Sequence, residues 1–398
     1  MRDSKEVAPS GKRADSPKMP IVPHGSLERI TRMLNSMNKK GLPDKVEPEI
    51  PLNEDVTLHC VQFAHEQLGI DVKDADTSGD LNAADFDYIK VDVVTGGLTN
   101  ILYKVTNTKN GRVVAVRMFG NKTEVFIDRM RERKIQRHLC AQGFAKNVYA
   151  YFNGGQIEDW LEGESLSEED FQGFKYSKLI AQEMRKIHQS PGQAELYLAL
   201  NPTAKLDGDV KMASMLWPRV WKFYEVCMEN VNELQSIIGS HFNIVDLKLN
   251  IERLQRICEA VNSPIALCHG DLCKSNIVIG QSSKVLFIDY EYACIMERAY
   301  DIANHLKEFV EYNSNDYSLP SQERQDEFIR SYLGEGATEE DVEALRREIK
   351  AFVMVSDLHW GLWGLLQCVY SSIESDFPCY SVNRIKLFLQ EIKSFDQF

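Results

Sequence analysis

The sequence has no long apolar run, no secretory leader pattern and no regularly spaced cysteines. No segment approaches the roughly 20 consecutive apolar residues that a membrane-spanning helix needs. The N-terminus lacks the charged and apolar segments of a secretory signal. The nine cysteines are scattered, odd in number and without metal-ligand spacing. These absences predict a cytoplasmic chain without a membrane span, whose thiols stay reduced.

Positive charge is also scarce. The chain has 46 Lys and Arg against 59 Asp and Glu, for a net charge of −13. This balance disfavours general binding to nucleic acid or anionic membranes, but it leaves room for a local basic pocket for a nucleotide. The 43% apolar and 10% aromatic content is typical of a globular protein, and 398 residues suffice for two lobes.

The order of predicted elements divides the chain into three parts. Residues 1–48 are rich in Lys, Arg, Pro and Ser and predict a mostly disordered tail. Beyond them, patterning predicts helices and β-strands: helices at 53–69 and 123–142, and strands at 88–94, 101–106, 113–118, 148–152 and 156–160. From residue 167 the chain reads as mainly helical, with one hairpin at 276–288. We therefore predict an α+β, two-lobed protein-kinase-like fold, with an antiparallel N-lobe at 49–163 and a helix-rich C-lobe at 164–398.

One short stretch carries the side chains that phosphoryl transfer requires. Asp271 and Asn276 follow His269, and Asp289 comes at the end of an apolar run, 285–288. The spacing matches the H-x-D-x-x-x-x-N loop of kinases and the metal-binding aspartate of the next hairpin. We expect Asp271 to act as catalytic base, and Asn276 with Asp289 to hold the Mg2+ that neutralises the ATP phosphates. The alternative is a buried polar turn between two strands.

The predicted N-lobe offers further phosphate-binding groups. Gly97, Thr99 and Asn100 lie between two strands, where backbone and side-chain donors can approach phosphates; a plain hairpin turn is the alternative. Arg117 ends an apolar strand, where a kinase places its phosphate-binding cation. Glu132, in the next predicted helix, is expected to pair with Arg117.

Two other segments have weaker signals. The connector that includes Asp159 and Leu161 is expected to border an adenine ring with backbone groups and an apolar wall. Residues 74–85 fit an EF-hand calcium loop with Asp at the last position. Because residues 86–94 read as a strand rather than an exit helix, an acidic solvated turn is the favoured interpretation.

Taken together, residues 91–398 resemble the choline/ethanolamine kinase family. Besides the stretches above, two blocks carry the resemblance: Tyr-Asp-Ile-Ala-Asn-His at 300–305, and Trp-Gly-Leu-Trp at 360–363 with Ser-Ser-Ile-Glu at 371–374. Protein kinases lack the paired tryptophans, and aminoglycoside phosphotransferases lack the C-terminal block. The resemblance implies a kinase-like fold, ATP as phosphate donor and a small amino alcohol as acceptor.

The resemblance also implies an amine pocket. Glu308 matches its acidic residue, Trp360, Trp363 and Tyr380 match its aromatic wall, and Tyr292 matches a further ring near the substrate. An ammonium group is bound well by aromatic faces plus a carboxylate. Trp360 and Trp363 are three apart and share a helix face. Ordinary core packing is the alternative reading of such a pair.

Three departures from the family pattern bear on substrate choice and loop behaviour. Gly270 stands where the family usually has Asn, which is expected to make the loop more flexible. Phe309 and Phe377 stand where choline-preferring members tend to have Trp and Tyr. They favour ethanolamine as substrate, in the first step of phosphatidylethanolamine synthesis. Choline, or both amines, is the alternative substrate, and another small alcohol such as an aminoglycoside is a more distant one. A pseudokinase that only binds its ligands is also left open. A homodimer is possible.

Overall fold

The computed structural model describes residues 89–94, 100–120, 123–152, 155–204, 212–310, 319–371, 373 and 375–395. Several predictions fall on other residues. The tail at 1–48, the helix at 53–69, the acidic loop at 74–85, and Gly97 with Thr99 all lie outside the described residues.

Five antiparallel strands form the N-terminal sheet, in the order β1-β2-β3-β5-β4. They are β1 (Ile89–Val94), β2 (Asn100–Asn107), β3 (Val113–Phe119), β4 (Val148–Phe152) and β5 (Gly155–Asp159). The five predicted strands are confirmed, and their ends differ by at most one residue. β3 lies between β2 and β5 and buries Val114, Ala115 and Val116 in succession, as expected of a strand covered on both faces.

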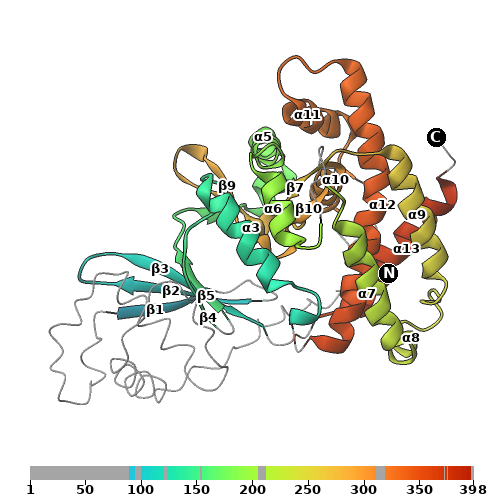
Figure 1. The fold of residues 1–398 in the computed structure, drawn as a ribbon, viewed down its shortest axis with the longest axis horizontal. Helices are drawn as coiled ribbons and strands as arrows, with labels where there is room; N and C mark the ends of the chain where they lie inside the picture. Colours follow the sequence, from blue (N-terminus) through green and yellow to red (C-terminus); the bar gives the residue numbers. More distant parts are fainter. Residues whose placement is uncertain are drawn as a thin grey trace, which may run out of the picture.

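The predicted helix at 123–142 begins later than its sequence pattern suggests. A short 3-10 turn (Thr123–Val125) precedes α3 (Arg129–Ala141). The helix starts at Arg129 because Asp128 is extended and its carboxylate accepts a hydrogen bond from the Arg131 backbone N–H, which satisfies a free helix-end donor. Glu132 therefore lies in the first turn of α3. α3 lies beside the N-terminal sheet (Figure 1).

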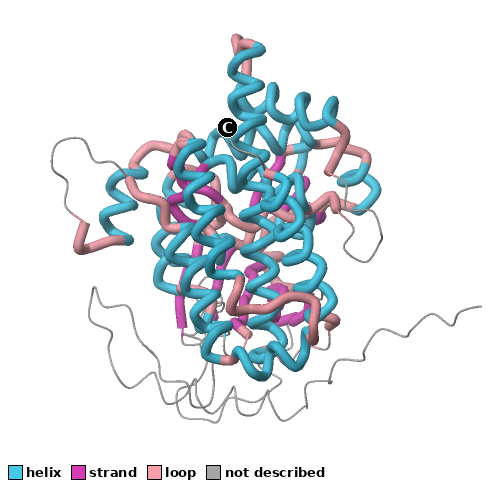
Figure 2. Tube along the Cα trace, turned by 90° about the vertical axis from the view of Figure 1, so that its right-hand side faces the viewer, coloured by secondary structure: helices cyan, strands magenta, loops and turns pink. Residues whose placement is uncertain are grey.

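Most of the described chain after residue 167 is helical, as predicted. The helices are α4 (Glu168–Gln172), α5 (Ser177–His188), α6 (Gln193–Leu200), α7 (Leu216–Glu229), α8 (Val231–Ile238), α9 (Leu247–Val261), α10 (Arg298–Lys307), α11 (Gln322–Leu333), α12 (Glu339–Tyr370) and α13 (Phe377–Ser394). α12 has 32 residues and packs against α7, α9, α10 and α13. Every residue from 351 to 367 is buried, as expected of a helix surrounded by others. Figure 2 shows this helical layer face on.

Two small sheets hold the segments between the helices. β6 (Glu164–Ser165), β8 (Ile277–Ile279) and β9 (Val285–Phe287) form one, and β7 (Ile265–Cys268) pairs with β10 (Cys294–Glu297) in the other. The predicted hairpin at 276–288 is confirmed as β8–β9. The β7–β10 pair was not predicted, because its two strands are short and far apart in sequence.

The molecule therefore has the predicted α+β, two-lobed protein-kinase-like fold, with the sheet and α3 beside a helix-rich lobe (Figure 1). The predicted lobe boundary at 163/164 precedes β6 and stays a prediction, and the boundary at 48/49 lies outside the described residues.

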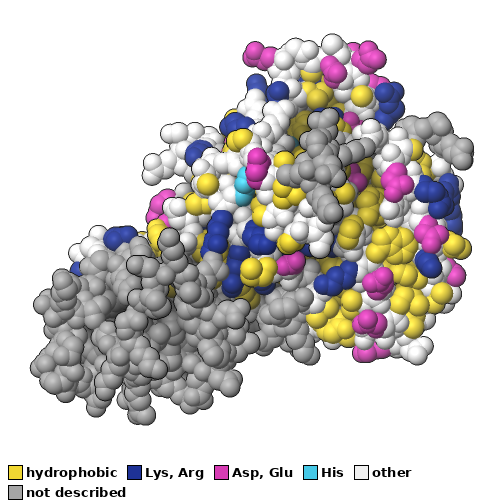
Figure 3. Space-filling model, viewed as in Figure 1, with side chains coloured by type: hydrophobic (Ala, Val, Ile, Leu, Met, Phe, Trp, Pro, Cys, Tyr) yellow, Lys and Arg dark blue, Asp and Glu magenta, His cyan; other side chains and the backbone are white. Residues whose placement is uncertain are grey.

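The described surface adds two observations. None of the described helices is both long and apolar enough to cross a bilayer. Apolar side chains gather on one end of the helical lobe in Figure 3, where Figure 1 places α8 and α9. Ile237, Val245 and Leu249 are exposed there. A homodimer stays a prediction.

Candidate active site

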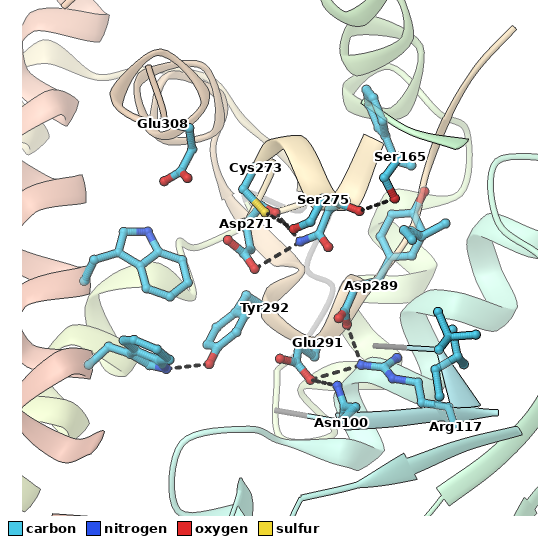
Figure 4. A pocket seen from close by; sticks show the side chains of 18 of the residues that line it. Asn100, Arg117, Ser165, Asp271, Cys273, Ser275, Asp289, Glu291, Tyr292 and Glu308 are labelled. Carbon is cyan, nitrogen blue, oxygen red and sulfur yellow. Dashed lines mark hydrogen bonds and ion pairs between the residues drawn. The ribbon is translucent and has the colours of Figure 1, made fainter. Parts of the chain in front are cut away.

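A cavity of about 730 Å³ lies between the sheet and the helical lobe. Its lining combines residues of both lobes, and Figure 4 shows part of it. The predicted site residues among the lining are Asn100, Arg117, Asp271, Asn276, Asp289, Tyr292, Glu308, Trp360, Trp363 and Tyr380. Residues that are as much as 280 positions apart, from Asn100 to Tyr380, thus meet in one cavity.

The catalytic loop runs from β7 to β8 and is anchored from behind by α10. The backbone N–H groups of His269 and Gly270 donate to the carboxylate of Asp301, at 2.8 and 2.7 Å. The ring of His305 donates from Nδ1 to the carbonyl oxygen of Leu272 at 2.8 Å. Asp301 and His305 both belong to the 300–305 block on α10, so this block holds the backbone of the catalytic loop in place.

Within the loop, Asn276 orients Asp271. The amide Nδ2 of Asn276 donates to the Asp271 carbonyl at 2.8 Å and to its carboxylate Oδ2 at 3.2 Å. This use of Nδ2 leaves the amide oxygen as a ligand atom for a cation. Burial, followed by the negative charges of Glu308, Asp289 and Glu291, raises the pKa of Asp271 well above its ordinary value. A carboxyl group with a raised pKa suits a proton acceptor.

Gly270 occupies a conformation that few other residues adopt. Its φ is +82°, and a Cβ added there would press against the carbonyl oxygen of Tyr292. The backbone N–H groups of Gly270 and of the preceding His269 donate to Asp301, so the loop is held at this point. The greater flexibility expected from glycine stays a prediction.

Arg117 joins the N-lobe to the residues after β9. Its guanidinium donates to Glu132 at 2.8 Å and to Glu291 at 3.0 Å, and it also forms an ion pair with Asp289 (Figure 4). Although burial acts to lower it, the charges of Asp289, Glu132 and Glu291 raise the pKa of Arg117, which therefore stays cationic. The predicted pairing of Arg117 with Glu132 is confirmed.

Arg129 and Glu291 belong to this cluster but were not among the predicted site residues. Arg129 donates to Glu132 at 2.8 Å and to Glu291 at 3.1 Å, and Asn100 donates to Glu291 at 3.1 Å. Glu291 lies only two positions after Asp289, and that second carboxylate was the available signal. Arg129 offered none, since an arginine in the first turn of a helix is most often on the surface.

The donor set at this end of the cavity fits a hard divalent cation. Asp289 adopts the left-handed conformation, with φ +66°, at the turn after β9. Burial raises the pKa of Asp289, and Arg117 opposes this shift. Burial and Asp289 likewise raise the pKa of Glu291. One or two carboxylates with an amide oxygen are ligands that suit Mg2+, together with substrate phosphates.

Asp159 and Leu161 fit their predicted role less directly. The Asp159 carboxylate accepts from the backbone N and Nδ2 of Asn147, at 3.1 and 2.7 Å, and from the Tyr149 hydroxyl. That last bond, with burial, raises the pKa of Tyr149 to about 12. Neither Asp159 nor Leu161 lines the described part of the cavity, so their contact with a nucleotide stays a prediction.

Other residues border the cavity near β5 instead. Lys146 forms an ion pair with the buried Glu158 at 2.7 Å, and Gln136 donates to the same carboxylate at 3.2 Å. All three line the cavity, as does Ser165 of β6. Sequence reasoning did not find them, because single polar residues on a strand or helix have no distinctive spacing.

The opposite end of the cavity has an aromatic wall. Trp360 donates from Nε1 to Asn304 and Trp363 donates from Nε1 to the Tyr292 hydroxyl, both at 2.7 Å. The two indole rings lie 5.4 Å apart in an edge-to-face arrangement, and Tyr292 lies 5.1 Å from Trp360. These hydrogen bonds fix the ring orientations, and both rings line the cavity. Their contact with an amine stays a prediction.

α13 and the end of α10 complete this wall. Phe377 and Tyr380 pack edge-on against Trp363, at 5.8 and 6.3 Å between ring centroids. Glu308, at the C-terminus of α10, lines the same cavity, and burial raises its pKa while Arg384 opposes the shift. Phe309 is not among the lining residues; its ring stacks on Phe171 at 4.0 Å. An effect of Phe309 on substrate choice stays a prediction.

In Figure 4, Asp271 lies between Glu308 and Asp289. The fold and the site thus define a kinase-like phosphotransferase. Residues 91–389 match the family model of choline/ethanolamine kinase. The chain belongs to the choline/ethanolamine kinase family and is a kinase.

Individual proteins that resemble this chain belong to the same family. Ethanolamine kinase 1 of Mus musculus is 33% identical over 322 residues, which span 76% of this chain and 84% of the mouse protein. The structure of an ethanolamine kinase from Plasmodium vivax is 31% identical, with a TM-score of 0.72, over 90% of this chain and 94% of that one. A choline kinase from Cryptosporidium parvum, 24% identical with a TM-score of 0.58 over 77% of this chain and 90% of its own, shares the fold.

Proposed function

We propose that the protein transfers the γ-phosphoryl group of ATP to the hydroxyl group of ethanolamine. The observation that carries this proposal is the position of Asp271, between a cation-binding cluster and a pocket of rings with a carboxylate (Figure 4). A substrate with an ammonium group at one end and a hydroxyl at the other fits this order. The similarity to ethanolamine kinases of mouse and Plasmodium vivax supports the same substrate.

Each site residue has a separate role in the proposed reaction. Asp271 accepts the hydroxyl proton as the hydroxyl oxygen bonds to the γ-phosphorus and the bond from that phosphorus to the β–γ bridging oxygen breaks, which releases ADP. Asn276 holds the Asp271 carboxylate in place. Arg117 stabilises charge on the phosphates, and Glu132 fixes its guanidinium. Asn276 and Asp289 would hold Mg2+, which supplies further charge neutralisation when bound.

The amine end is read by complementary groups. A primary ammonium donates hydrogen bonds to Glu308, while the faces of Trp360 and Trp363 attract its charge. Choline is the second candidate, because the rings can hold a trimethylammonium group without hydrogen bonds. The product from ethanolamine, phosphoethanolamine, would enter phosphatidylethanolamine synthesis. A cytoplasmic location accords with eight described cysteines, all of them free thiols.

A substrate panel tests the proposal. Purified protein with ATP and Mg2+ is offered ethanolamine, choline and an aminoglycoside, and the phosphorylated product is identified by phosphorus NMR. We expect the highest kcat/KM with ethanolamine. Turnover of the aminoglycoside alone, or nucleotide binding without any turnover, would overturn the proposed function.

A further inference from the structure

A buried chain of charged side chains joins three helices behind the amine pocket. Lys307, at the end of α10, lies 2.9 Å from Asp357 Oδ2 in the middle of α12. Arg384 of α13 donates from Nη1 to Asp357 Oδ1 at 3.2 Å and from Nη2 to Glu308 Oε1 at 3.5 Å. The side chains of Lys307, Asp357 and Arg384 are at most 1% exposed, whereas Glu308 is 24% exposed.

Arg384 also reaches the aromatic wall. Its guanidinium lies 5.3 Å from the ring centroid of Tyr380, which is one helical turn earlier on α13 and lines the cavity. Tyr380 in turn packs against Trp363. A single buried cation therefore contacts both the anion and one ring of the pocket that faces the substrate ammonium.

The arrangement divides one guanidinium between two carboxylates. Arginine can do this because its planar fork presents donors in two directions, whereas lysine offers a single point charge. Asp357 holds one side of the fork at the shorter distance, so the contact with Glu308 stays long. Glu308 is thereby oriented, and the charge of Arg384 favours its ionised form against the effect of burial without fully neutralising it. Such a carboxylate can still accept hydrogen bonds from a bound ammonium.

We propose that Arg384, held by Asp357 and Lys307, is a positioning residue that sets the pocket's preference for ammonium groups with N–H donors. It does so by fixing the Glu308 carboxylate toward the amine. The inference rests on the proposed function, since it concerns how the same site distinguishes primary from methylated amines. Arg384 does not line the cavity and would not touch the substrate.

The test uses a graded series of substrates: ethanolamine, its N-methyl and N,N-dimethyl derivatives, and choline. KM and kcat are measured for wild type, Arg384→Lys and Asp357→Asn, and amine binding is measured by calorimetry. In wild type, KM should rise with each N–H donor lost. In Arg384→Lys the ethanolamine KM should rise about tenfold, the size of a lost charge-assisted hydrogen bond. The choline KM and both kcat values should change less than about threefold.

Asp357→Asn is the second variant and nearly preserves shape. Loss of the Asp357 charge should draw Arg384 onto Glu308 and mask it, so the ethanolamine KM rises selectively here too. Arg298→Lys is the matched control, because Arg298 also bridges two helices, to Glu348 of α12 at 2.8 Å, and neither residue lines the cavity. It should cost thermal stability without changing the dependence on methylation.

The outcomes separate the two proposals. If wild type turns over none of the amines, the proposed function fails, while calorimetry still reports the methylation series in the variants. Equal changes for ethanolamine and choline, a change in kcat alone, or the same shift in Arg298→Lys would overturn the role of Arg384. Failure of both network variants to fold, with the control intact, would assign the network to stability and also overturn it.

Discussion

The amide of Asn276 donates to the carboxylate of Asp271 at 3.2 Å, so the expected metal ligand also holds the expected base. One side chain thus couples the geometry of the cation site to that of proton transfer. The coupling follows from the five-residue separation, because the loop turns back on itself within the short 3-10 turn that ends at Asn276.

Asp271→Ala should lower kcat by about 10²–10⁴-fold, the usual contribution of a general base, while ATP binding stays close to wild type. Arg117, the proposed phosphate-binding cation, is untouched by the change. Stopped-assay kcat and calorimetric ATP affinity check the two halves separately. Retention of more than about a tenth of wild-type turnover would remove Asp271 from the role of base.

Activity should fall on the acidic side of the pH profile, with a midpoint pH above the ordinary pKa of an aspartate. Asp271 must be ionised to accept a proton, and burial with neighbouring carboxylates raises its pKa, so activity is lost as the pH falls through that raised value. The raised pKa also means that the ionised form of Asp271 is costly in the folded state. The protonated form therefore contributes to the free energy of unfolding, and this contribution is lost as the pH rises through the raised pKa. The profile of kcat/KM against pH measures the limb. A midpoint near 4, the ordinary value for an aspartate, would contradict the prediction.

Asp289→Asn should raise the Mg2+ concentration needed for half-maximal rate and should lower the rate itself, because one ligand loses its charge. The same change frees Arg117 from one of its ion pairs. The measurement is a Mg2+ titration of turnover at saturating ATP. Asp326→Asn is a suitable control, since Asp326 pairs with Arg346 on the helical lobe and is not a cavity residue. An unchanged titration would exclude Asp289 as a ligand.

Ring and carboxylate changes in the amine pocket should each reduce kcat/KM, but each change should affect a different amine more strongly. Trp363→Leu should reduce kcat/KM more for choline, which relies on ring faces, and Glu308→Gln should reduce it more for ethanolamine, which donates hydrogen bonds. A difference of about tenfold is expected, equivalent to roughly 1–2 kcal/mol per desolvated cation–π contact. Phe309→Leu is the aromatic control, because Phe309 lies outside the cavity lining. Equal losses for both amines would leave the two residues as scaffold.

The amino-acid sequence by itself determined the local features of this protein. The strands, the catalytic loop and the turn after it each depend on residues within a few positions of one another, and the spacing of Asp271, Asn276 and Asp289 predicts their chemistry. The pairing of Arg117 with Glu132 was also predicted, because α3 is the first α-helix after β3 and the two residues are only 15 positions apart.

Only the tertiary structure decided which distant charges meet. Glu308 and Arg384 are 76 positions apart, and Arg129 and Glu291 are 162 apart. A buried arginine in an amphipathic helix has the same local pattern as one on the surface, so nothing near Arg384 or Arg129 in the sequence marks it. Their partners were chosen by the packing of α10, α12 and α13 and of α3 against the turn after β9. In these buried settings an unpaired charge is costly, and the fold supplies each one with a counter-charge that the local sequence does not contain.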